Sequence, residues 1–451
     1  MIKDMTTGSP TKTLCFFSIP MLLSVMFQQI YNIADSMIAG QYIGEDALAA
    51  VGASYPITMI FMAVAIGCNI GSSVVISQLF GAGRLKEMKT AIFTTFIVSL
   101  VISFILTVLG LLLSKGMMQL IQTPSNIFED AKLYLQIYIG GMTFLFLYNI
   151  CTGVFTALGD SRTPLYFLIG SSIGNILLDL IFVIVFKWGV AGVAWATFVA
   201  QGISCILSLV TLVRRIQNIH IDGKAVYFSW NTLFRISQIA IPSILQQSFI
   251  SVGNLLIQGL INSYGSTVIA GYASAVKLNT FAITSFTTLG NGVSSFTAQN
   301  IGAGKKERVR LGFKSGYLMA IMIVIPFFIA YFFLSDTMLG LFMKEESEEA
   351  LNVGKTFLKI TSPFYIIISA KLIADGVLRG AGAMRQFMIA TFSDLILRVM
   401  LSFILAYFWG TIGIWVSWPI GWIIGMLLSC LFYKTGTWEK VQMDSVKIQS
   451  K

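Results

Sequence analysis

Twelve apolar segments, each long enough to cross a lipid bilayer, constrain the fold of this 451-residue chain more than any other feature. A membrane-spanning helix needs about 20 mostly apolar residues. Only 11% of the residues are charged, whereas roughly a quarter are charged in soluble proteins. The sequence therefore predicts an all-α polytopic membrane protein with twelve transmembrane helices, near residues 14–40, 51–80, 91–113, 131–158, 163–186, 188–213, 235–263, 267–299, 312–334, 353–381, 386–408 and 411–433.

The first apolar segment is expected to remain in the protein as a span. It runs from about Leu14 to Gly40, which is longer than the ~7–15 apolar residues of a cleavable signal peptide. The single histidine, His220, cannot form a metal site alone, and no phosphate-binding loop or nucleophile–histidine–acid set is visible. We expect no enzyme activity and no cofactor. The five cysteines show no metal-binding or disulfide spacing and are interpreted as free thiols: Cys15, Cys68, Cys151, Cys205 and Cys430.

The basic residues give the twelve spans an orientation. An even number of spans puts both termini on one side, and the loops on that side hold most of the 30 Lys and Arg residues. Because cytoplasmic loops are enriched in Lys and Arg, we expect both termini in the cytoplasm and the net charge of +10 to reflect topology, with no nucleic-acid partner. The opposite loops hold only Lys115, Lys132, Lys187, Lys344, Lys355 and Lys359.

The second half of the chain repeats the first. Residues 76–83 read ISQLFGAG and residues 297–304 read TAQNIGAG. Residues 153–162, GVFTALGDSR, resemble residues 376–385, GVLRGAGAMR, and Pro20 matches Pro242 at nearly the same separation. A near-constant separation over three blocks indicates an internal repeat.

Each repeat holds six spans, so both halves enter the membrane in the same direction. This arrangement predicts two six-helix lobes related by a pseudo-two-fold axis along the membrane normal, with a cleft between them, as in transporters built from parallel repeats. The expected organisation is a cytoplasmic N-terminus (1–13), an N-lobe (14–213), a cytoplasmic loop (214–234), a C-lobe (235–433) and a cytoplasmic tail (434–451).

Seven ionisable residues fall within the expected spans, where each charge costs at least ~2.5–3.5 kcal/mol. In the C-lobe, Lys371 and Asp375 are four residues apart, as are Asp394 and Arg398. This spacing lets each pair neutralise itself on one helix face. Lys277 has no partner in its own span and could meet Asp375 or Asp394 on another helix.

The two remaining acids, Asp35 and Asp179, lie in the N-lobe without a basic residue within a helical turn. Tyr31 precedes Asp35 by one turn, and Asn175 precedes Asp179 by one turn. Two neighbouring carboxylates in a low dielectric disfavour simultaneous ionisation. Such a pair can therefore hold a proton near neutral pH or bind a hard cation such as sodium through its oxygens. The alternative is that each aspartate bonds only to neighbouring amides.

These features together resemble the multidrug and toxic compound extrusion (MATE) transporters. The resemblance covers nearly the whole chain: twelve spans, two lobes, and a Gln-x-x-Gly-Ala-Gly block that closes the second span of each lobe. The most specific parts are ALGDSRTP at 157–164 and the segment GNILLDLIF that follows it and contains Asn175 and Asp179. The resemblance is strongest to the prokaryotic branch of the DNA-damage-inducible F type.

The resemblance implies export of organic cations and amphipathic drugs in exchange for protons or sodium ions. In that branch the coupling ion binds in the N-lobe, at positions that correspond to Asp35, Asp179, Tyr31, Asn175 and Thr197. A NorM-like branch uses C-lobe acids, including a glutamate on span seven. Span seven of this chain contains glutamines but no acidic residue. We therefore expect coupling in the N-lobe, and a substrate cavity drawn from Gln28, Asn32, Gln246, Lys277 and Asp375.

The expected setting is a bacterial cytoplasmic membrane, with the protein embedded in lipid as a monomer. One alternative function is a flippase for lipid-linked saccharides from the same superfamily. Such a protein needs cationic residues to meet pyrophosphate, and Lys277 and Arg398 are the features that would supply them. The N-lobe spans contain acids and no bases, which favours the antiporter.

Overall fold

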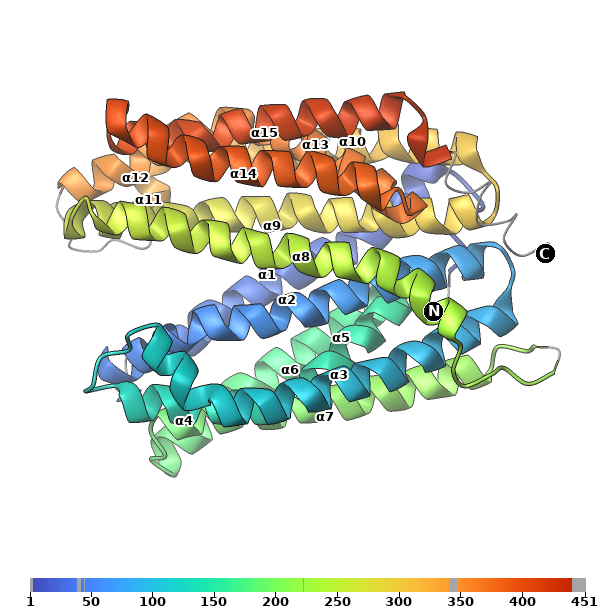
Figure 1. Cartoon of the computed structure of the whole chain (residues 1–451), viewed down its shortest axis with the longest axis horizontal. Coiled ribbons are helices and arrows are strands. Elements are labelled where there is room, and N and C mark those ends of the chain that lie inside the picture. The colour runs from blue at the N-terminus through green and yellow to red at the C-terminus, as the bar shows by residue number, and fades with distance from the viewer. Residues whose placement is uncertain (1–2, 39–41, 44, 222, 341–347, 440–451) are drawn as a thin grey trace. The chain divides into compact units, whose positions relative to one another are not determined.

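The computed structural model describes residues 3–38, 42–43, 45–221, 223–340 and 348–439, and the side chains of residues 32–37 and 45–48 lie outside this description. The described chain is helical, without strands (Figure 1). Its helices are α1 (Pro10–Ile38), α2 (Glu45–Gly81), α3 (Leu85–Leu120), α4 (Phe128–Gly140), α5 (Met142–Ala157), α6 (Arg162–Leu180), α7 (Val190–Gln217), α8 (Trp230–Asn262), α9 (Ser266–Gly302), α10 (Lys306–Phe333), α11 (Ser335–Gly340), α12 (Glu348–Thr361), α13 (Tyr365–Ala381), α14 (Met384–Trp409) and α15 (Thr411–Lys434).

All twelve predicted spans coincide with helices. Within the described residues, 10 helical stretches are long and apolar enough to cross a membrane, and the bent pair α4–α5 makes an eleventh. The remaining long helix is α9, with 37 residues. Polar residues such as Lys277 and Asn279 lower its hydropathy, although it is as long as its counterpart in the repeat, α2. The all-α, twelve-helix prediction is confirmed.

Two of the predicted spans are broken, which the hydropathy pattern did not reveal. Helices α4 and α5 meet at Gly141 with a bend of 48°. Helices α12 and α13 are joined by a 3₁₀ turn, Ser362–Phe364, that contains a proline. Proline lacks the N–H group that would continue the helical hydrogen bonds, so it interrupts the ladder at this point.

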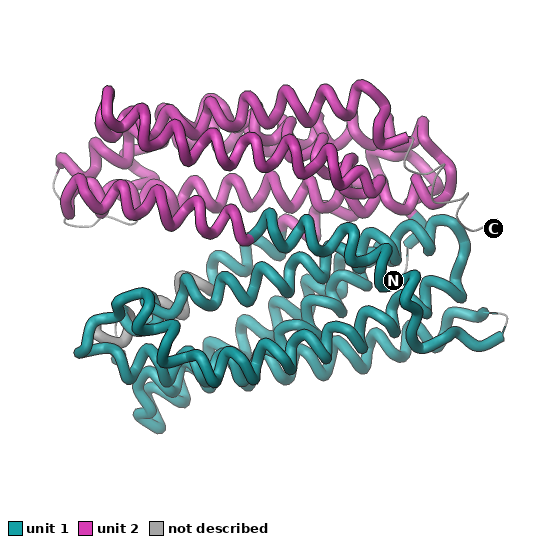
Figure 2. The backbone as a smooth tube through the Cα atoms, in the orientation of Figure 1, with its two compact units in different colours: residues 1–4, 23–247 teal, residues 5–22, 248–451 magenta. Residues whose placement is uncertain are grey.

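Contacts between Cα atoms divide the chain into two compact units, coloured separately in Figure 2. Unit 1 comprises Met1–Asp4 and Leu23–Gln247, and unit 2 comprises Met5–Leu22 and Ser248–Lys451. The boundaries pass through α1 and α8, so these two helices each contribute to both units. The lobes expected from the sequence begin at residues 14 and 235, nearer the starts of these two helices.

Each unit has its own apolar core. In unit 1, residues of α2, α3, α4 and α5 pack together, with Phe61 and Phe146 among the largest. In unit 2 the core is aromatic: Tyr272 stacks on Trp415 with ring centroids 5.2 Å apart, and the Phe357 ring meets Trp415 edge-on at 5.1 Å. Aromatic pairs of this geometry add to the stability that comes from burial alone.

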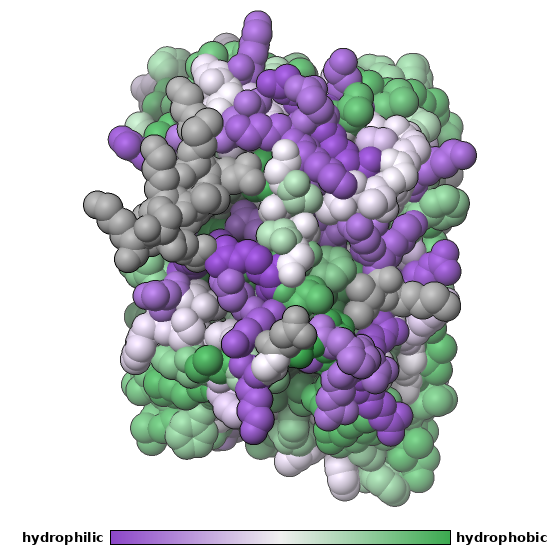
Figure 3. Space-filling view, turned by 90° about the vertical axis from the view of Figure 1, so that its right-hand side faces the viewer, coloured by the Kyte–Doolittle hydropathy of each residue, from purple (hydrophilic) through white to green (hydrophobic). Residues whose placement is uncertain are grey.

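Apolar side chains also cover the outside of the helices. On α3, the exposed residues include Val101, Phe104 and Leu112, the last with 75% of its surface exposed. In the view along the helices, hydrophilic residues gather on the face shown and apolar residues lie toward its edges (Figure 3). Large exposed apolar surfaces mark contact with a partner or a membrane, and here they fit the lipid-facing sides predicted from the sequence.

The sequence repeat reappears as a repeat of backbone conformation. Gly83 and Gly304 close the equivalent Gly-Ala-Gly blocks with φ values of 70° and 72°. Gly189 and Gly410 precede α7 and α15 with φ/ψ of 58°/−137° and 57°/−139°. Residues other than glycine rarely adopt such positive φ values. The glycines therefore fix the same turns in both halves of the chain.

A second pair of equivalent glycines allows close helix packing. On α13 a Cβ atom added to Gly376 would lie 2.4 Å from the carbonyl oxygen of Gly290 on α9. On α5 a Cβ atom added to Gly153 would lie 1.9 Å from the side-chain oxygen of Asn69 on α2. Because these glycines have no side chain, α5 packs closely against α2 in the first half, and α13 packs closely against α9 in the second half.

Replacing Gly376 with Ala should weaken the packing of α9 against α13. The added methyl group meets backbone on α9, which cannot move aside as a flexible side chain would, and we expect a loss of about 1–3 kcal/mol. The fraction of purified protein that stays monodisperse after heating would measure this loss. The matched control is Gly259→Ala on α8, where an added Cβ meets no atom within 4 Å; equal losses in both variants would contradict the packing account.

Candidate ion-coupling site

The start of α6 is fixed by Asp160, the acid of the ALGDSRTP motif. Its Oδ1 accepts the backbone N–H groups of Arg162 and Thr163, each at 3.1 Å, and its Oδ2 accepts the Thr163 hydroxyl at 2.7 Å. Arg215, at the end of α7, forms an ion pair with Asp160 and donates to the Thr163 hydroxyl at 2.8 Å. An acid at the start of a helix satisfies N–H groups that lack helical partners. The motif therefore joins the first turn of α6 to the last turn of α7.

Sequence reasoning did not anticipate the role of Arg215, because it lies 55 positions from Asp160 along the chain. Burial acts to raise the pKa of the Asp160 carboxyl, but the hydrogen bonds from Arg215 and Thr163 outweigh it and hold the pKa below its usual value. The ionised form is thus favoured by folding.

Asp160→Asn should destabilise the protein by about 3 kcal/mol, the low end for breaking a buried ion pair, because Arg215 is partly exposed. The folded-state pKa lies below the unfolded value of about 3.9. The stability that the ionised Asp160 carboxylate contributes should therefore be complete at neutral pH and disappear as the pH falls below about 4. Melting curves of wild type and variant across this range would measure it. The exposed Asp130→Asn on α4 serves as control, and a difference that persists at low pH would contradict the assignment.

Asn175 and Asp179 lie one turn apart on α6 and are both buried inside unit 1. Asp179 has 0% of its surface exposed, and Asn175 has 3%. Neither the side-chain oxygen nor the side-chain nitrogen of Asn175 has a hydrogen-bond partner among the described residues. Buried polar groups are nearly always hydrogen-bonded, and exceptions point to water, an ion or a functional role. The predicted pair of polar side chains on one helix face is therefore present and lies away from lipid.

The helix changes its winding directly after Asp179. Residues Ile181–Val185 form a π-helical turn, and Lys187 then takes a positive φ of 55°. Single π-helical turns inside α-helices occur often at functional sites. Here the turn follows the buried acid and precedes the α6–α7 connection.

The internal repeat relates Asn175 and Thr197 to two residues of the second half that contact each other. The glycines at 159 and 382 precede α6 and α14, so Asn175 corresponds to Arg398 and Asp179 to Ser402. The segment from Gly159 to Gly189 is two residues longer than the equivalent segment from Gly382 to Gly410. The π-helical turn and Lys187 in the first half account for the extra length. Thr197 on α7 therefore corresponds to Trp418 on α15. The Arg398 guanidinium lies 4.7 Å from the centre of the Trp418 ring, and the predicted proximity of the equivalent residues Asn175 and Thr197 in unit 1 stays a prediction.

The predicted residues of span one lie on α1. Tyr31 is half-buried and Gln28 is exposed. The side chains of Asp35 and Asn32 lie outside the described residues, so the predicted juxtaposition of Asp35 and Asp179 stays a prediction. Thr197 is half-buried, and Gln246 on the first part of α8 is half-buried with no partner for its Oε1 among the described residues.

The C-lobe acids form a different arrangement from the one predicted. Lys371 does pair with Asp375, with 2.8 Å between Nζ and Oδ2. However, Asp394 lies 3.6 Å from the same Lys371 nitrogen, whereas Arg398 turns its guanidinium to Trp418. The prediction that Asp394 pairs with Arg398 is wrong. Packing explains why, because α13 and α14 lie against α15, and Lys371 reaches both carboxylates there.

Asp375 and Lys277 therefore differ from the buried pair in unit 1. Asp375 accepts a hydrogen bond of 2.5 Å from Ser429 in addition to its ion pair with Lys371. Lys277 is exposed on α9, one residue before Leu278, whose carbonyl accepts a hydrogen bond from Tyr331 near the end of α10. Lys277 thus lies in the first half of α9, on an exposed face of the helix.

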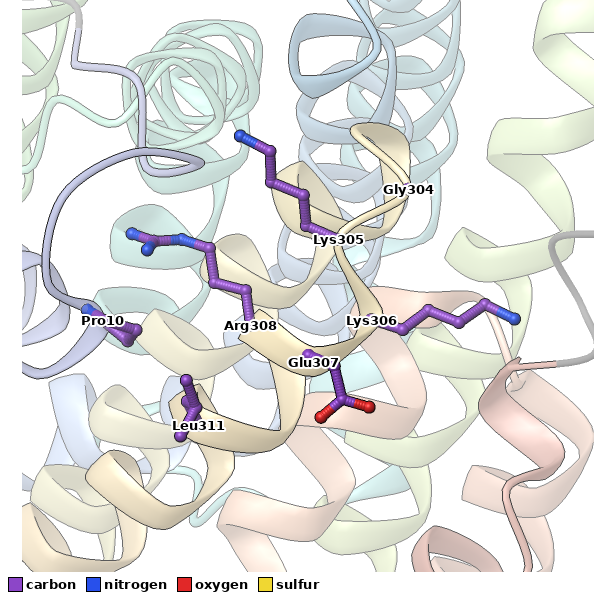
Figure 4. A pocket seen from close by; sticks show the side chains of 7 residues that line it. All are labelled: Pro10, Gly304, Lys305, Lys306, Glu307, Arg308 and Leu311. Carbon is purple, nitrogen blue, oxygen red and sulfur yellow. The ribbon is translucent and has the colours of Figure 1, made fainter.

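The N-terminal segment is another feature that the sequence did not predict. The N–H group of Met5 donates to the Gln299 side chain at 2.9 Å, and Lys305 donates to the Thr6 carbonyl at 2.8 Å. Arg308 donates to the carbonyls of Met5 and neighbouring residues. Figure 4 shows Lys305 and Arg308 pointing to the same side of the α9–α10 turn, with Lys306 pointing away. Lys305 and Arg308, which follow the second Gly-Ala-Gly block, thus bind the backbone of the N-terminal segment within unit 2.

The donor set around Asp179 suits a small hard cation or a proton. The Asp179 carboxylate and the Asn175 amide, one turn apart on α6, offer oxygen atoms, which sodium prefers over sulfur or nitrogen. In the part of the chain that the structure describes, no group of three His, Cys, Asp or Glu residues gathers as a metal site.

Comparison with known proteins places the chain in a family. The sequence profile of the MatE family matches residues 20–181 and 242–404, one stretch in each half. The chain is 29% identical to "Probable multidrug resistance protein YpnP" of Bacillus subtilis (strain 168), over 98% of this chain and 99% of that protein. It is 27% identical to "Probable multidrug resistance protein YoeA" of the same strain, over 96% and 95%.

Solved structures show the same fold. A structure described as "Outward-facing conformation of a multidrug resistance MATE family transporter of the MOP superfamily" superposes with a TM-score of 0.90 at 21% identity, over 97% of this chain and 98% of that one. The two profile matches cover most of the chain, and they coincide with the two halves of the repeat described above. The chain belongs to the MatE (MATE) family of membrane transporters, and it is not an enzyme.

Proposed function

We propose that this protein is an antiporter that exports amphipathic drugs and organic cations in exchange for a proton or a sodium ion. Within the proposed mechanism, Asp179, Asn175 and Thr197 in unit 1 bind the coupling ion, together with Asp35 and Tyr31 from α1. The ion and the substrate favour different conformations, so binding of one promotes release of the other.

The observation that carries the proposal is the fully buried Asp179 beside an Asn175 side chain with both polar atoms unsatisfied among the described residues. Ionisable residues inside a membrane are costly and are retained for function. The relatives described as multidrug resistance proteins support the substrate class. The DNA-damage-inducible F type branch, which also uses the N-lobe, fits the absence of an acid from the α8 sequence.

The orientation and setting follow from the basic loops. We infer that the ends of the helices next to Arg84, Arg214 and Lys305 face the cytoplasm of a bacterial cell, in accordance with the positive-inside rule. Both termini lie on this side in the proposed topology. The protein acts as a monomer in this account, because each chain carries its own coupling residues.

The alternative, a flippase for lipid-linked saccharides, loses part of its support. It depends on cations that are available to a pyrophosphate group. Arg398 is buried over Trp418, and Lys371 is engaged by two carboxylates. Of the two cations that the sequence offered for this role, Lys277 and Arg398, only Lys277 is exposed, so the antiporter is favoured.

Dye efflux from proteoliposomes tests the proposed function. Purified protein is reconstituted with an entrapped fluorescent organic cation such as ethidium, and an inward proton gradient or an inward sodium gradient is imposed separately. We expect export with one gradient and not with the other, which identifies the coupling ion. Export that is the same with no gradient, or absent with both gradients, would contradict the antiporter.

A further inference from the structure

The two halves of the chain place different chemistry at equivalent positions. Unit 1 has the amide Asn175 and the acid Asp179, whereas unit 2 has Arg398 and Ser402. Arg398 is 7% exposed and Ser402 is completely buried. The repeat thus puts a permanent positive charge in unit 2 where unit 1 offers oxygen ligands and a negative charge.

The environment of Arg398 leaves its charge in place. A guanidinium stays protonated in proteins, and this one lies over the face of the Trp418 ring. Asp394, one turn earlier on α14, is engaged by Lys371, and Arg398 makes no ion pair within 4 Å among the described residues. The Nε atom of Arg398 has no hydrogen-bond partner there either.

Other charges packed around this position are already used. On α13, Lys371 pairs with Asp375, and Arg379 donates to the Asn291 side chain at 2.5 Å. On α15, Ser429 donates to Asp375. The same register relates Lys371, Asp375 and Asp394 of the second half to three residues of the first half. These equivalents are uncharged: they are Tyr148, Thr152 and Ser171, respectively. The charges of unit 2 are therefore not a requirement of the shared fold.

We propose that Arg398 is a tethered cation that excludes the coupling ion from unit 2 and so confines ion coupling to unit 1. A fixed positive charge in a low-dielectric interior strongly disfavours a second cation nearby. The cation–π contact with Trp418 holds the guanidinium at the position equivalent to Asn175 and Thr197 in unit 1. This inference rests on the proposed function, because it assigns the number and place of its ion sites.

Exchanging the residue pairs between the halves tests the proposal. The double variant R398N/S402D installs the unit 1 pair in unit 2. Ser417 Oγ, which is 2.7 Å from Ser402 Oγ, can donate to the new carboxylate. Binding of radioactive sodium, or proton release on addition of ethidium measured with a pH-indicator dye, is counted per chain in purified full-length protein. We expect one ion in wild type, two in R398N/S402D, and one in R398K/S402D, which keeps a cation beside the new carboxylate.

The D179N variant separates failure of this inference from failure of the proposed function. In D179N the single ion should disappear, and adding R398N/S402D to D179N should restore one. If D179N still binds the ion, the proposed coupling site is wrong. If D179N loses it but folded R398N/S402D binds no second ion, the role of Arg398 is overturned.

The reverse transfer provides a second test that does not depend on folding of the double variant. N175R places in unit 1 the residue that unit 2 carries, and it should expel the coupling ion, while N175Q should retain it. Melting curves establish that both variants are folded. A folded N175R protein that binds the ion as tightly as wild type would also overturn the proposal.

Discussion

Replacing Asp179 with Asn is expected to abolish ion-driven drug export while leaving the protein folded. The amide has nearly the same shape as the carboxylate, so packing inside unit 1 is kept, but it carries no charge for a proton or sodium ion to neutralise. Mutation of a residue that only supports a metal ligand typically reduces affinity or activity about 10- to 100-fold, so removal of the ligand carboxylate itself should cost at least as much. Drug resistance of a sensitised bacterial host at matched expression, together with gradient-driven dye efflux, measures the effect.

Two matched controls make this result specific. Asp130→Asn removes an exposed acid of the same unit, and Asp375→Asn removes a buried acid of unit 2 that is engaged by Lys371 and Ser429. Neither should change which gradient drives export, because neither acid belongs to the coupling site. Unimpaired resistance in Asp179→Asn at wild-type expression would contradict the assignment.

The second large effect is expected on stability, in the triad of Lys371, Asp375 and Asp394. Lys371→Met removes the only cation within 4 Å of either carboxylate among the described ion pairs. Two carboxylates then remain buried side by side without compensation. Breaking a buried ion pair from one side costs about 3–5 kcal/mol. We expect a much lower melting temperature and poor recovery of monodisperse protein.

Neutralising the partners should reverse most of this loss. In the triple variant K371M/D375N/D394N no buried charge is left unpaired, and replacing a complete buried ion-pair set by neutral groups is often nearly neutral for stability. Recovery of the melting temperature in the triple variant relative to Lys371→Met would support the triad. A triple variant that is less stable than the single one would show that the side chains contribute by packing alone.

Much of the fold could be predicted from the sequence because a bilayer demands long apolar helices. All twelve segments coincide with helices, and the matched blocks around Gly153 and Gly376 are equivalent in the structure. The breaks at Gly141 and in the 3₁₀ turn before α13 were not predicted. Average hydropathy does not register a bend between two apolar stretches.

The candidate site was predictable to a different degree in each half. Asn175 and Asp179 share a helix face by spacing alone, and their burial agrees with a site inside the protein. Spacing misled the pairing of Asp394 and Arg398, because contacts with α13 and α15 compete with contacts inside one helix. The link between Asp160 and Arg215 needed three-dimensional structure for the same reason. Whether Asp35 meets Asp179 stays a prediction.

Ion release on drug binding is a direct test of the proposed placement of the coupling ion at Asp179. Purified protein is loaded with the coupling ion, ethidium is added, and the ions released per chain are counted by radioactive sodium or by a pH-indicator dye, in wild type and in Asp179→Asn. We expect release of one ion from wild type as the drug binds, and drug binding without ion release from the variant. Equal release from both proteins would contradict the placement of the coupling ion at Asp179.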